Sequence, residues 1–151
     1  MANRAWSRGA YSVTDALADY VRDIADRMHL RDWVILVSDD PEDVPEDGVD
    51  DERCATFSGT LGRRAAFIWI NREYWEQATP EEQRQTIVHE LIHAHEHTAR
   101  EVVIHALTVY PRRTADVLQG IYDVQMEYAI DTLADVIAPF LPLPPEGDAN
   151  A

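Results

Sequence analysis

Lysine is absent from this 151-residue chain, and Cys54 is its single cysteine. One cysteine cannot form a disulfide within the chain, so the fold has to rest on a hydrophobic core, and a reducing compartment is favoured. No apolar run approaches about 18 residues, which argues against a transmembrane helix. No apolar stretch of signal-peptide length follows the first methionine. From these absences we expect a soluble, cytoplasmic protein.

Positive charge is also scarce. The chain has 13 basic residues, all of them arginine, and 28 acidic residues, which give a net charge of −15. Such a surface repels the phosphates of nucleic acids and of anionic membranes, so we expect neither as a partner. At 46% hydrophobic and 27% charged residues, the composition is that of an ordinary globular protein. The length predicts a single domain, over residues 1–138, followed by a proline-rich irregular tail over 139–151.

Much of the negative charge lies in one segment. Residues 39–52 contain nine acidic side chains and no basic ones, together with two prolines and a glycine. This composition predicts a solvated loop, and the ligand spacing of a calcium-binding loop is absent. A further hypothesis is that the acidic loop covers a substrate cleft or favours basic substrates.

The first half of the chain predicts one helix and three strands. Apolar residues recur at helical spacing over 13–28, with Ser12 as a candidate N-cap. The short β-branched run 33–37 predicts a buried strand. Strands are also predicted over 54–58 and 65–71, and the glycines between them favour a β-hairpin.

The second half predicts helices. The sequence Thr-Pro-Glu-Glu at 79–82 has a capping residue, a proline at the first helical position and the glutamate of a capping box. We expect this helix to run to about residue 97, a short helix over 102–109 and a long last helix over 114–138. The fold class is therefore α+β.

One five-residue motif points to chemistry: His89-Glu90-Leu91-Ile92-His93, an H-E-x-x-H pattern inside the capped helix. Residues four apart lie about 40° from each other on a helix, so both imidazoles can reach one metal ion. Glu90 lies about 100° further round, where it can contact a water on the metal. Neutral imidazole suits zinc. Apolar neighbours make the motif half-buried, which favours a metal over two incidental surface histidines.

A catalytic zinc site needs a third protein ligand. The metzincin pattern is excluded because it requires histidine at position 99, where the sequence has Ala99. His97, at the end of the same helix, is one alternative. Glu127 and Asp131, four residues apart on the last helix with Asp123 one turn earlier, offer another. A metal would neutralise these carboxylates on a largely apolar helix, whereas a solvated helix face would explain them without one.

These two motifs together resemble a known family. His89-Glu90-x-x-His93 followed by Glu127-x-x-x-Asp131 resembles the gluzincin pattern of zinc metallopeptidases. Over about 12–138 the chain is more closely similar to small zincins of the ImmA/IrrE and SprT-like kind, including compact phage-type metallopeptidases. The resemblance implies a zincin-like domain with an N-terminal helix, a three-stranded sheet, the H-E-x-x-H helix and a C-terminal ligand-bearing helix. It also implies that strand 65–71 is the sheet edge that aligns an extended peptide.

The resemblance also implies roles for single residues. His89, His93 and Glu127 would bind one Zn²⁺, and Glu90 would be the general base. Asp131 would accept a hydrogen bond from a zinc-binding histidine and fix its tautomer. The candidates for stabilising the oxyanion are Tyr110, Tyr122, Tyr128 and His105.

The function expected from this pattern is zinc-dependent peptide-bond hydrolysis on a dedicated protein or peptide substrate. The alternative is a non-catalytic acidic binding protein, either a nucleic-acid mimic or a regulatory zincin without activity. Its zinc would then be structural, and a structural site needs four protein ligands, with His97 as the candidate fourth. Intact Glu90 favours the enzyme, because an inactive zincin has no need of the base.

Overall fold

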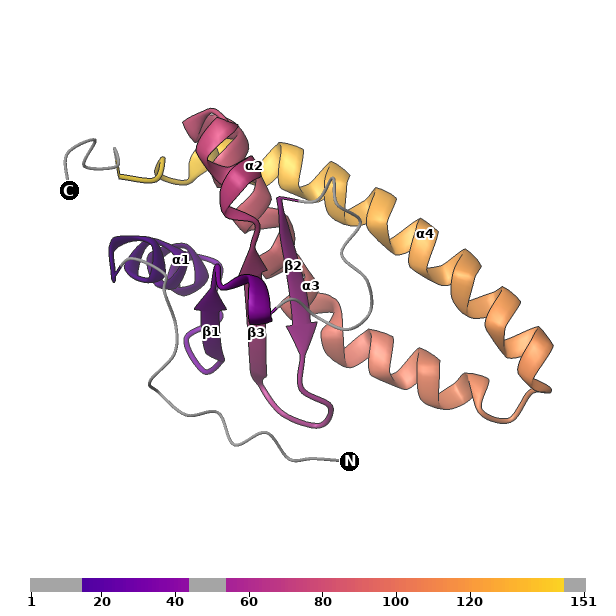
Figure 1. Cartoon of the computed structure of the whole chain (residues 1–151). Helices are drawn as coiled ribbons and strands as arrows, with labels where there is room; N and C mark the ends of the chain where they lie inside the picture. Colours follow the sequence, from indigo (N-terminus) through magenta and orange to yellow (C-terminus); the bar gives the residue numbers. More distant parts are fainter. Residues whose placement is uncertain (1–14, 44–53, 146–151) are drawn as a thin grey trace.

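The computed structural model describes residues 15–43 and 54–145, which form four α-helices and a three-stranded mixed sheet (Figure 1). The predicted α+β class is therefore confirmed. The elements in chain order are α1 (Asp15–Arg27), β1 (Val34–Ser38), the 3₁₀ helix η1 (Pro41–Asp43), β2 (Ala55–Gly59), β3 (Ala65–Ile70), α2 (Arg72–Gln77), α3 (Pro80–Leu107), α4 (Arg112–Ile137) and the 3₁₀ helix η2 (Ala138–Phe140).

The sheet has the strand order β1-β3-β2, with β1 parallel and β2 antiparallel to the central strand β3. The predicted hairpin between β2 and β3 is confirmed. The prediction that strand 65–71 lies at the sheet edge is wrong, because β3 is paired on both sides and β2 is the edge strand beside the helices. The physical reason is that β3 is apolar on both faces, and five of its six residues are buried, which suits a central position.

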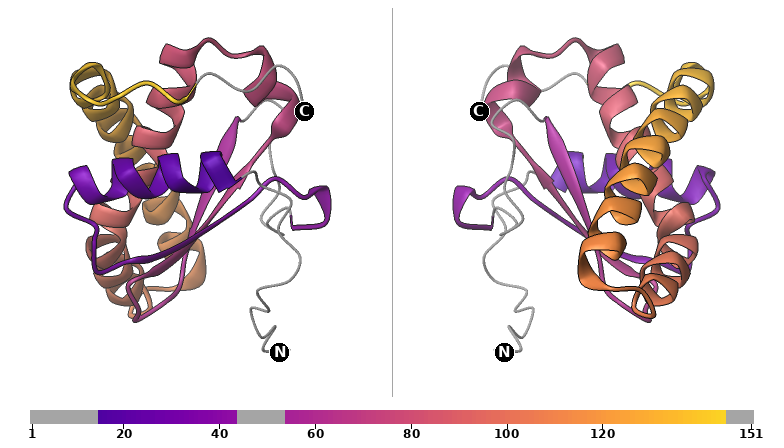
Figure 2. Two further views of the ribbon diagram at one scale, coloured as in Figure 1. Left: turned by 90° about the vertical axis from the view of Figure 1, so that its left-hand side faces the viewer. Right: turned by 90° about the vertical axis from the view of Figure 1, so that its right-hand side faces the viewer.

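Helices α1 and α3 cover one face of the sheet, as the two side views in Figure 2 show. Ile24 of α1, Ile68 of β3 and Ile87 and Leu91 of α3 are fully buried in this layer. Burial of each such side chain contributes about 1.5–3 kcal/mol, so the contact between helix and sheet helps to hold α3 in position. On the other face, Trp69 is buried and its indole N–H donates to the carbonyl of Asp40.

Helix α3 begins as predicted and ends later. Thr79 caps it, with the Glu82 N–H 3.3 Å from Thr79 Oγ1 and the Thr79 N–H 2.8 Å from Glu82 Oε2. The prediction of a break after about residue 97 and a separate helix over 102–109 is wrong, because α3 is continuous to Leu107. Neither proline nor glycine occurs between 80 and 110, so nothing in the sequence interrupts the backbone hydrogen bonds.

The remaining predictions concern the last helix, the proline-rich tail, Ser12 and the acidic loop. Helix α4 spans Arg112–Ile137 against the predicted 114–138, and the short helix α2 was not predicted. In the proline-rich tail, residues 138–140 form η2. The carbonyl of Leu141 accepts a hydrogen bond from Arg84, and the carbonyl of Pro142 accepts one from the Tyr20 hydroxyl.

Ser12, residues 44–52 of the acidic loop and residues 146–151 lie outside the described residues.

Helices α3 and α4 form an antiparallel hairpin whose tip projects beyond the sheet (Figure 1). Helix α3 packs on β2, and Glu127 and Asp131 lie in the half of α4 that is away from the tip. Among the described residues, no helix has both the length and the apolar character needed to cross a bilayer.

Candidate metal centre

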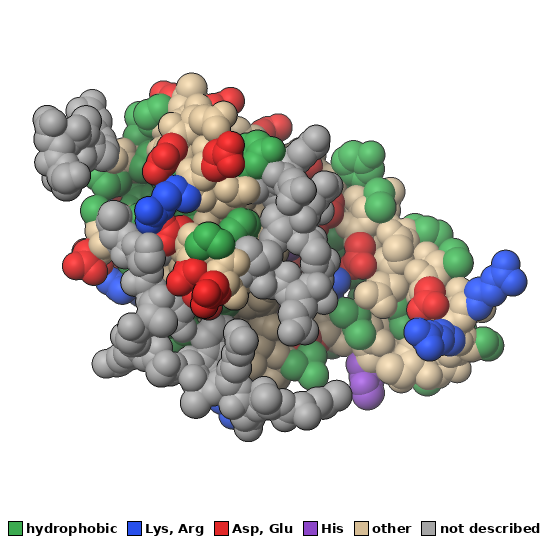
Figure 3. Space-filling model, in the orientation of Figure 1, with side chains coloured by type: hydrophobic (Ala, Val, Ile, Leu, Met, Phe, Trp, Pro, Cys, Tyr) green, Lys and Arg blue, Asp and Glu red, His purple; other side chains and the backbone are tan. Residues whose placement is uncertain are grey.

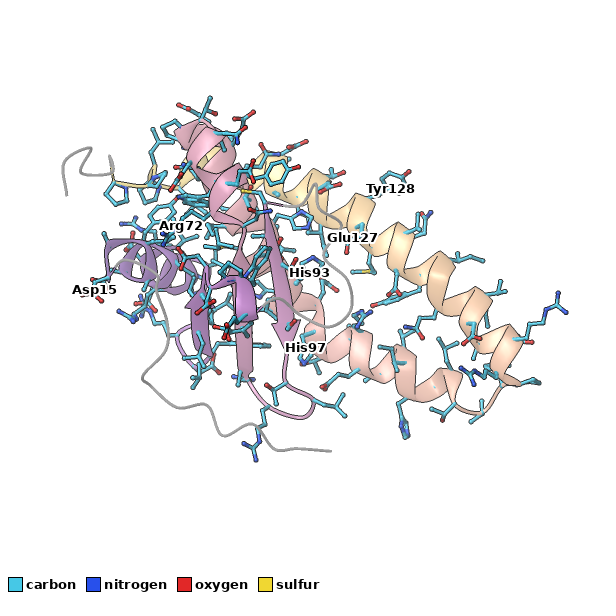
Figure 4. All side chains as sticks on the ribbon, in the orientation of Figure 1. Asp15, Arg72, His93, His97, Glu127 and Tyr128 are labelled. Carbon is cyan, nitrogen blue, oxygen red and sulfur yellow. The ribbon has the colours of Figure 1, made fainter. Side chains whose placement is uncertain are left out.

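Three predicted ligands come together where α4 crosses the middle of α3. His89 and His93 lie one turn apart on α3, and Glu127 faces them from α4 (Figure 4). Each offers one donor atom, and these atoms all lie within 4.8 Å of one another. The packing of Val88, Leu91 and Ile92 into the core turns the histidine face of α3 toward α4.

The spacing of the two imidazole nitrogens fits a tetrahedral zinc ion, and the Glu127 carboxylate lies close to both. His89 Nε2 lies 3.3 Å from His93 Nε2 and 3.4 Å from Glu127 Oε2, and His93 Nε2 lies 3.7 Å from Glu127 Oε1. Zinc bonds of about 2.0–2.2 Å at tetrahedral angles set the donors about 3.3–3.6 Å apart. Two imidazole nitrogens and a carboxylate oxygen are also the donor types that zinc takes in catalytic sites. The donor types therefore fit the ion. The two imidazole nitrogens have the tetrahedral spacing, and the two distances to Glu127 end on different oxygens of its carboxylate.

Asp131 lies beside the other nitrogen of the His89 ring. Its Oδ1 is 2.9 Å from His89 Nδ1, so Nδ1–H can donate to Asp131 while Nε2 faces the other ligands. Burial lowers the pKa of His89, but its hydrogen bond to the Glu127 carboxylate and the charges of Glu90, Glu127 and Asp131 outweigh burial and leave the pKa raised. Carboxylates on both sides of the ring therefore raise its basicity, which strengthens a metal ligand.

Glu90, the predicted general base, is 6% exposed and lines the same groove as the three ligands. Buried glutamates are rare unless they have polar partners or a chemical task. Its place next to His89 on the helix brings its carboxylate to the wall of the groove without making it a member of the ligand cluster.

A groove of about 1100 Å³ runs over the cluster. Its floor is α3, and its two walls are β2, from Cys54 to Gly59, and α4, from Tyr122 to Asp131. Five successive residues of β2, Ala55–Gly59, contribute to the lining. The cluster thus lies in a cleft with a strand along one wall.

The alternative ligand His97 lies elsewhere. It is not a member of the cluster that the described residues form. Its Nε2 lies 3.3 Å from the carbonyl of Thr60 and 3.2 Å from Glu101 Oε1, and its ring meets those of Trp33 and Phe57 edge-on. His97 therefore ties α3 to the β2–β3 turn and is not placed to be a fourth ligand.

The four residues predicted as candidates for stabilising the oxyanion differ in their position relative to the groove. Tyr122 lines the groove, where burial and the charge of Glu96 raise the pKa of its hydroxyl. Tyr110 is exposed near the tip of the hairpin, and Tyr128 points outward from α4, away from the cluster (Figure 4). His105 also lies near the tip, in the last turn of α3. Only Tyr122 of the four is among the residues that line the groove.

Two features of the site were missed by the sequence reasoning. Phe57 of β2 stacks on the imidazole of His93, with ring centroids 5.8 Å apart and planes 20° from parallel. Edge strand β2, not strand 65–71, forms the groove wall. An aromatic residue in a half-buried strand is too common a pattern to indicate such a contact, which depends on strand order.

Comparison of the chain with protein-family models, with curated proteins and with solved structures found no match. The similarity to zincins therefore rests on the two motifs and on the spacing of their side chains.

Proposed function

We propose that the protein is a zinc-dependent peptidase. The observation that carries this proposal is the cluster of His89, His93 and Glu127, whose donor atoms lie within 4.8 Å of one another, with the buried carboxylate of Glu90 lining the same groove. Three protein ligands leave one position of a tetrahedral ion open, as catalytic sites require.

The zinc ion and the protein side chains would contribute different parts of the reaction. A zinc ion held here would act as a Lewis acid on the scissile carbonyl and would acidify water. Glu90 accepts a proton from the attacking water and later donates it to the leaving amine nitrogen. Asp131 keeps the Nδ1 proton on His89, so that Nε2 carries the free lone pair.

The outer edge of β2 supports a peptide substrate. Cys54 and Thr60 direct their backbone groups to β3, since the Cys54 carbonyl accepts from Asn71 and the Thr60 N–H donates to Ala65. Alternate residues of a strand direct these groups to opposite sides, so Ala55, Phe57 and Gly59 direct theirs to the groove. An extended peptide in the groove would pair with these three residues by β-augmentation.

The charge of the groove favours basic residues in that peptide. Glu82 and Glu96 line it in addition to the site carboxylates. Among the described lining residues, the arginine Arg100 is already paired with Asp123 at 3.2 Å. The alternative of a structural zinc is less well supported, because the cluster of described residues has three members and not four.

The first test is metal content. Protein loaded with zinc and dialysed against metal-free buffer should hold about one zinc per chain by mass spectrometry, and less than about a tenth would contradict the proposal. His89→Ala should lose the zinc.

Cleavage tests the enzyme itself. Incubation with a random-sequence peptide mixture should yield new termini by mass spectrometry, and Glu90→Gln should keep the zinc but stop the cleavage. Glu81→Gln is the control, because it removes a carboxylate of α3 that is not among the lining residues of the groove, and it should keep both properties. A zinc-loaded protein that cleaves none of the peptides would favour the binding-protein alternative.

A further inference from the structure

The two histidines of the metal centre have neighbours of different kinds. Beside His89 is a carboxylate, since Asp131 Oδ1 lies 2.9 Å from His89 Nδ1. Against His93 lies the ring of Phe57, a residue of β2 that also lines the groove. The two ring planes are 20° from parallel and their centroids are 5.8 Å apart, which is an offset stack of the usual kind. The face of Phe57 therefore limits the orientations that the His93 ring can take.

The strand geometry of β2 places this ring toward α3. Phe57 is the cross-strand partner of Ile68, which is fully buried on the face of the sheet that α1 and α3 cover. Cross-strand partners direct their side chains to the same face, so Phe57 also faces α3. Its backbone N–H and C=O groups point instead to the free edge of β2, where a peptide is proposed to pair. Phe57 thus contacts the ligand with its ring and borders the groove with its backbone.

Two further rings contact Phe57, and we call Trp33, Phe57 and His97 the aromatic cluster. The Phe57 centroid lies 6.4 Å from that of Trp33 and 6.1 Å from that of His97, and the last two are 5.9 Å apart. His97 is itself held, because its Nε2 lies 3.3 Å from the Thr60 carbonyl and 3.2 Å from Glu101 Oε1. The three rings come from the segment before β1, from β2 and from α3, so the ring of Phe57 is fixed by contacts with two other parts of the fold.

The aromatic cluster and His93 are largely shielded from solvent. The side chains of His93 and His97 are 22% and 13% exposed, and Figure 4 shows both beside β2. Trp33 and Phe57 are partly buried and pack against the core. The main patch of histidine surface in Figure 3 lies elsewhere, along the lower edge of the α3–α4 hairpin. A ligand whose neighbours are locked by packing is held in position before any metal binds.

We propose that Phe57 is a positioning residue for His93, and that Trp33 and His97 hold it in place. This inference rests on the proposed zinc site. Binding to a cation draws electron density out of an imidazole, and the face of an aromatic ring attracts a positively polarised group. The stack therefore favours the metal-bound form of His93 as well as its orientation. It also gives a role to His97, which is outside the ligand cluster of the described residues.

Zinc affinity, measured by competition with a chromophoric chelator, tests the proposal. Phe57→Leu removes the ring but keeps an apolar side chain and the backbone groups of β2, and it should weaken zinc binding about 2- to 10-fold. Phe57→Tyr keeps the ring and should recover most of that loss. Phe67→Leu is the matched control, because Phe67 is buried in β3 outside the core cluster that contains Ile68. It should bind zinc as the parent does.

A cobalt spectrum reports on the ligands independently of affinity. Cobalt can take the place of zinc, and its d–d absorption depends on how its ligands are arranged. In chains saturated with Co²⁺, Phe57→Leu should shift these bands, whereas Phe57→Tyr and Phe67→Leu should keep the spectrum of the parent. A loss of fold stability alone would not shift the spectrum of a folded, saturated chain.

A double variant tests the support of the ring. His97→Ala should weaken zinc binding by less than Phe57→Leu, and the double variant should bind no more weakly than Phe57→Leu alone, because both act through one ring. Losses that multiply in the double variant would overturn the role given to His97. A Phe57→Leu chain with the zinc affinity and cobalt spectrum of the parent would overturn the positioning role and leave the zinc site intact. A parent chain that binds no zinc would overturn both proposals.

Discussion

Asp131 holds the Nδ1 side of the His89 imidazole, with 2.9 Å between its Oδ1 and the ring nitrogen. Because Glu127 stands one turn earlier on α4, one helix supplies both the third donor and the carboxylate that orients the first. The geometry of the site therefore depends on the contact between α3 and α4. A change in that contact would move Glu127 and Asp131 together.

Loss of the Asp131 carboxylate should weaken zinc binding without abolishing it. Asp131→Ala removes the acceptor that fixes His89, and such partners of a metal ligand are worth about 10–100-fold in affinity. Asp131→Asn should lose less, because its amide oxygen still accepts from Nδ1. Competition with a chromophoric chelator measures both. Asp135→Asn is the control one turn further on α4, and an equal loss in that variant would contradict the role of Asp131.

Zinc should stabilise the fold through the same residues. An ion that binds only the folded chain stabilises it by about 2.7 kcal/mol when its concentration is a hundred times the dissociation constant. We expect the melting temperature to rise by several degrees on adding zinc and to fall again with a chelator. His93→Ala should abolish this response. His95 lies on the same helix as His93, and its Nε2 is 2.8 Å from the Met28 carbonyl, which follows α1. His95→Ala should therefore lower stability yet keep the zinc response.

Local signals made much of α3 predictable. The capping box at Thr79, the helical pattern and the H-E-x-x-H motif all lie within the 28 residues of one element, so they can be read without knowing the fold. The spacing of Glu127 and Asp131 indicated the second helix for the same reason. The roles expected for these residues remain predictions, although their side chains lie where the roles require.

Non-local relationships were not predictable in this way. Which of the strands β2 and β3 lies at the edge depends on the parallel pairing of β3 with β1, about 30 residues earlier in the sequence. His97 satisfied the helical spacing of a ligand, but the β2–β3 turn offers it the Thr60 carbonyl, and it bonds there. No pattern in α3 alone could indicate this competition.

Alkaline pH should test the contact between α1 and the tail. Burial raises the pKa of Tyr20 from 10.0 to about 12, and its hydroxyl donates to the Pro142 carbonyl. A pKa that is higher in the folded chain stabilises it below pH 10, and this stabilisation is lost as the pH rises through the range from 10 to about 12. The loss should reach about 2 kcal/mol.

Urea unfolding at pH 9 and pH 11.5 measures this loss as a fall in the free energy of unfolding. Tyr20→Phe should be less stable at pH 9 but should lose less between the two pH values. Tyr110→Phe changes an exposed tyrosine and should follow the parent chain. A parent and a Tyr20→Phe chain with the same pH dependence would contradict the assignment.

The close approach of β2 to α3 should make Gly59 intolerant of any side chain. A Cβ at this position would clash with the imidazole of His97, so the imidazole or the strand has to move. Crowding of this kind typically costs 1–3 kcal/mol, and we expect Gly59→Ala to lower the free energy of unfolding by about that amount. His97→Ala removes the obstructing ring, so the same glycine substitution in that background should cost clearly less. If Gly59→Ala lowers the free energy of unfolding by the same amount with and without His97, the imidazole is not what excludes a side chain at position 59.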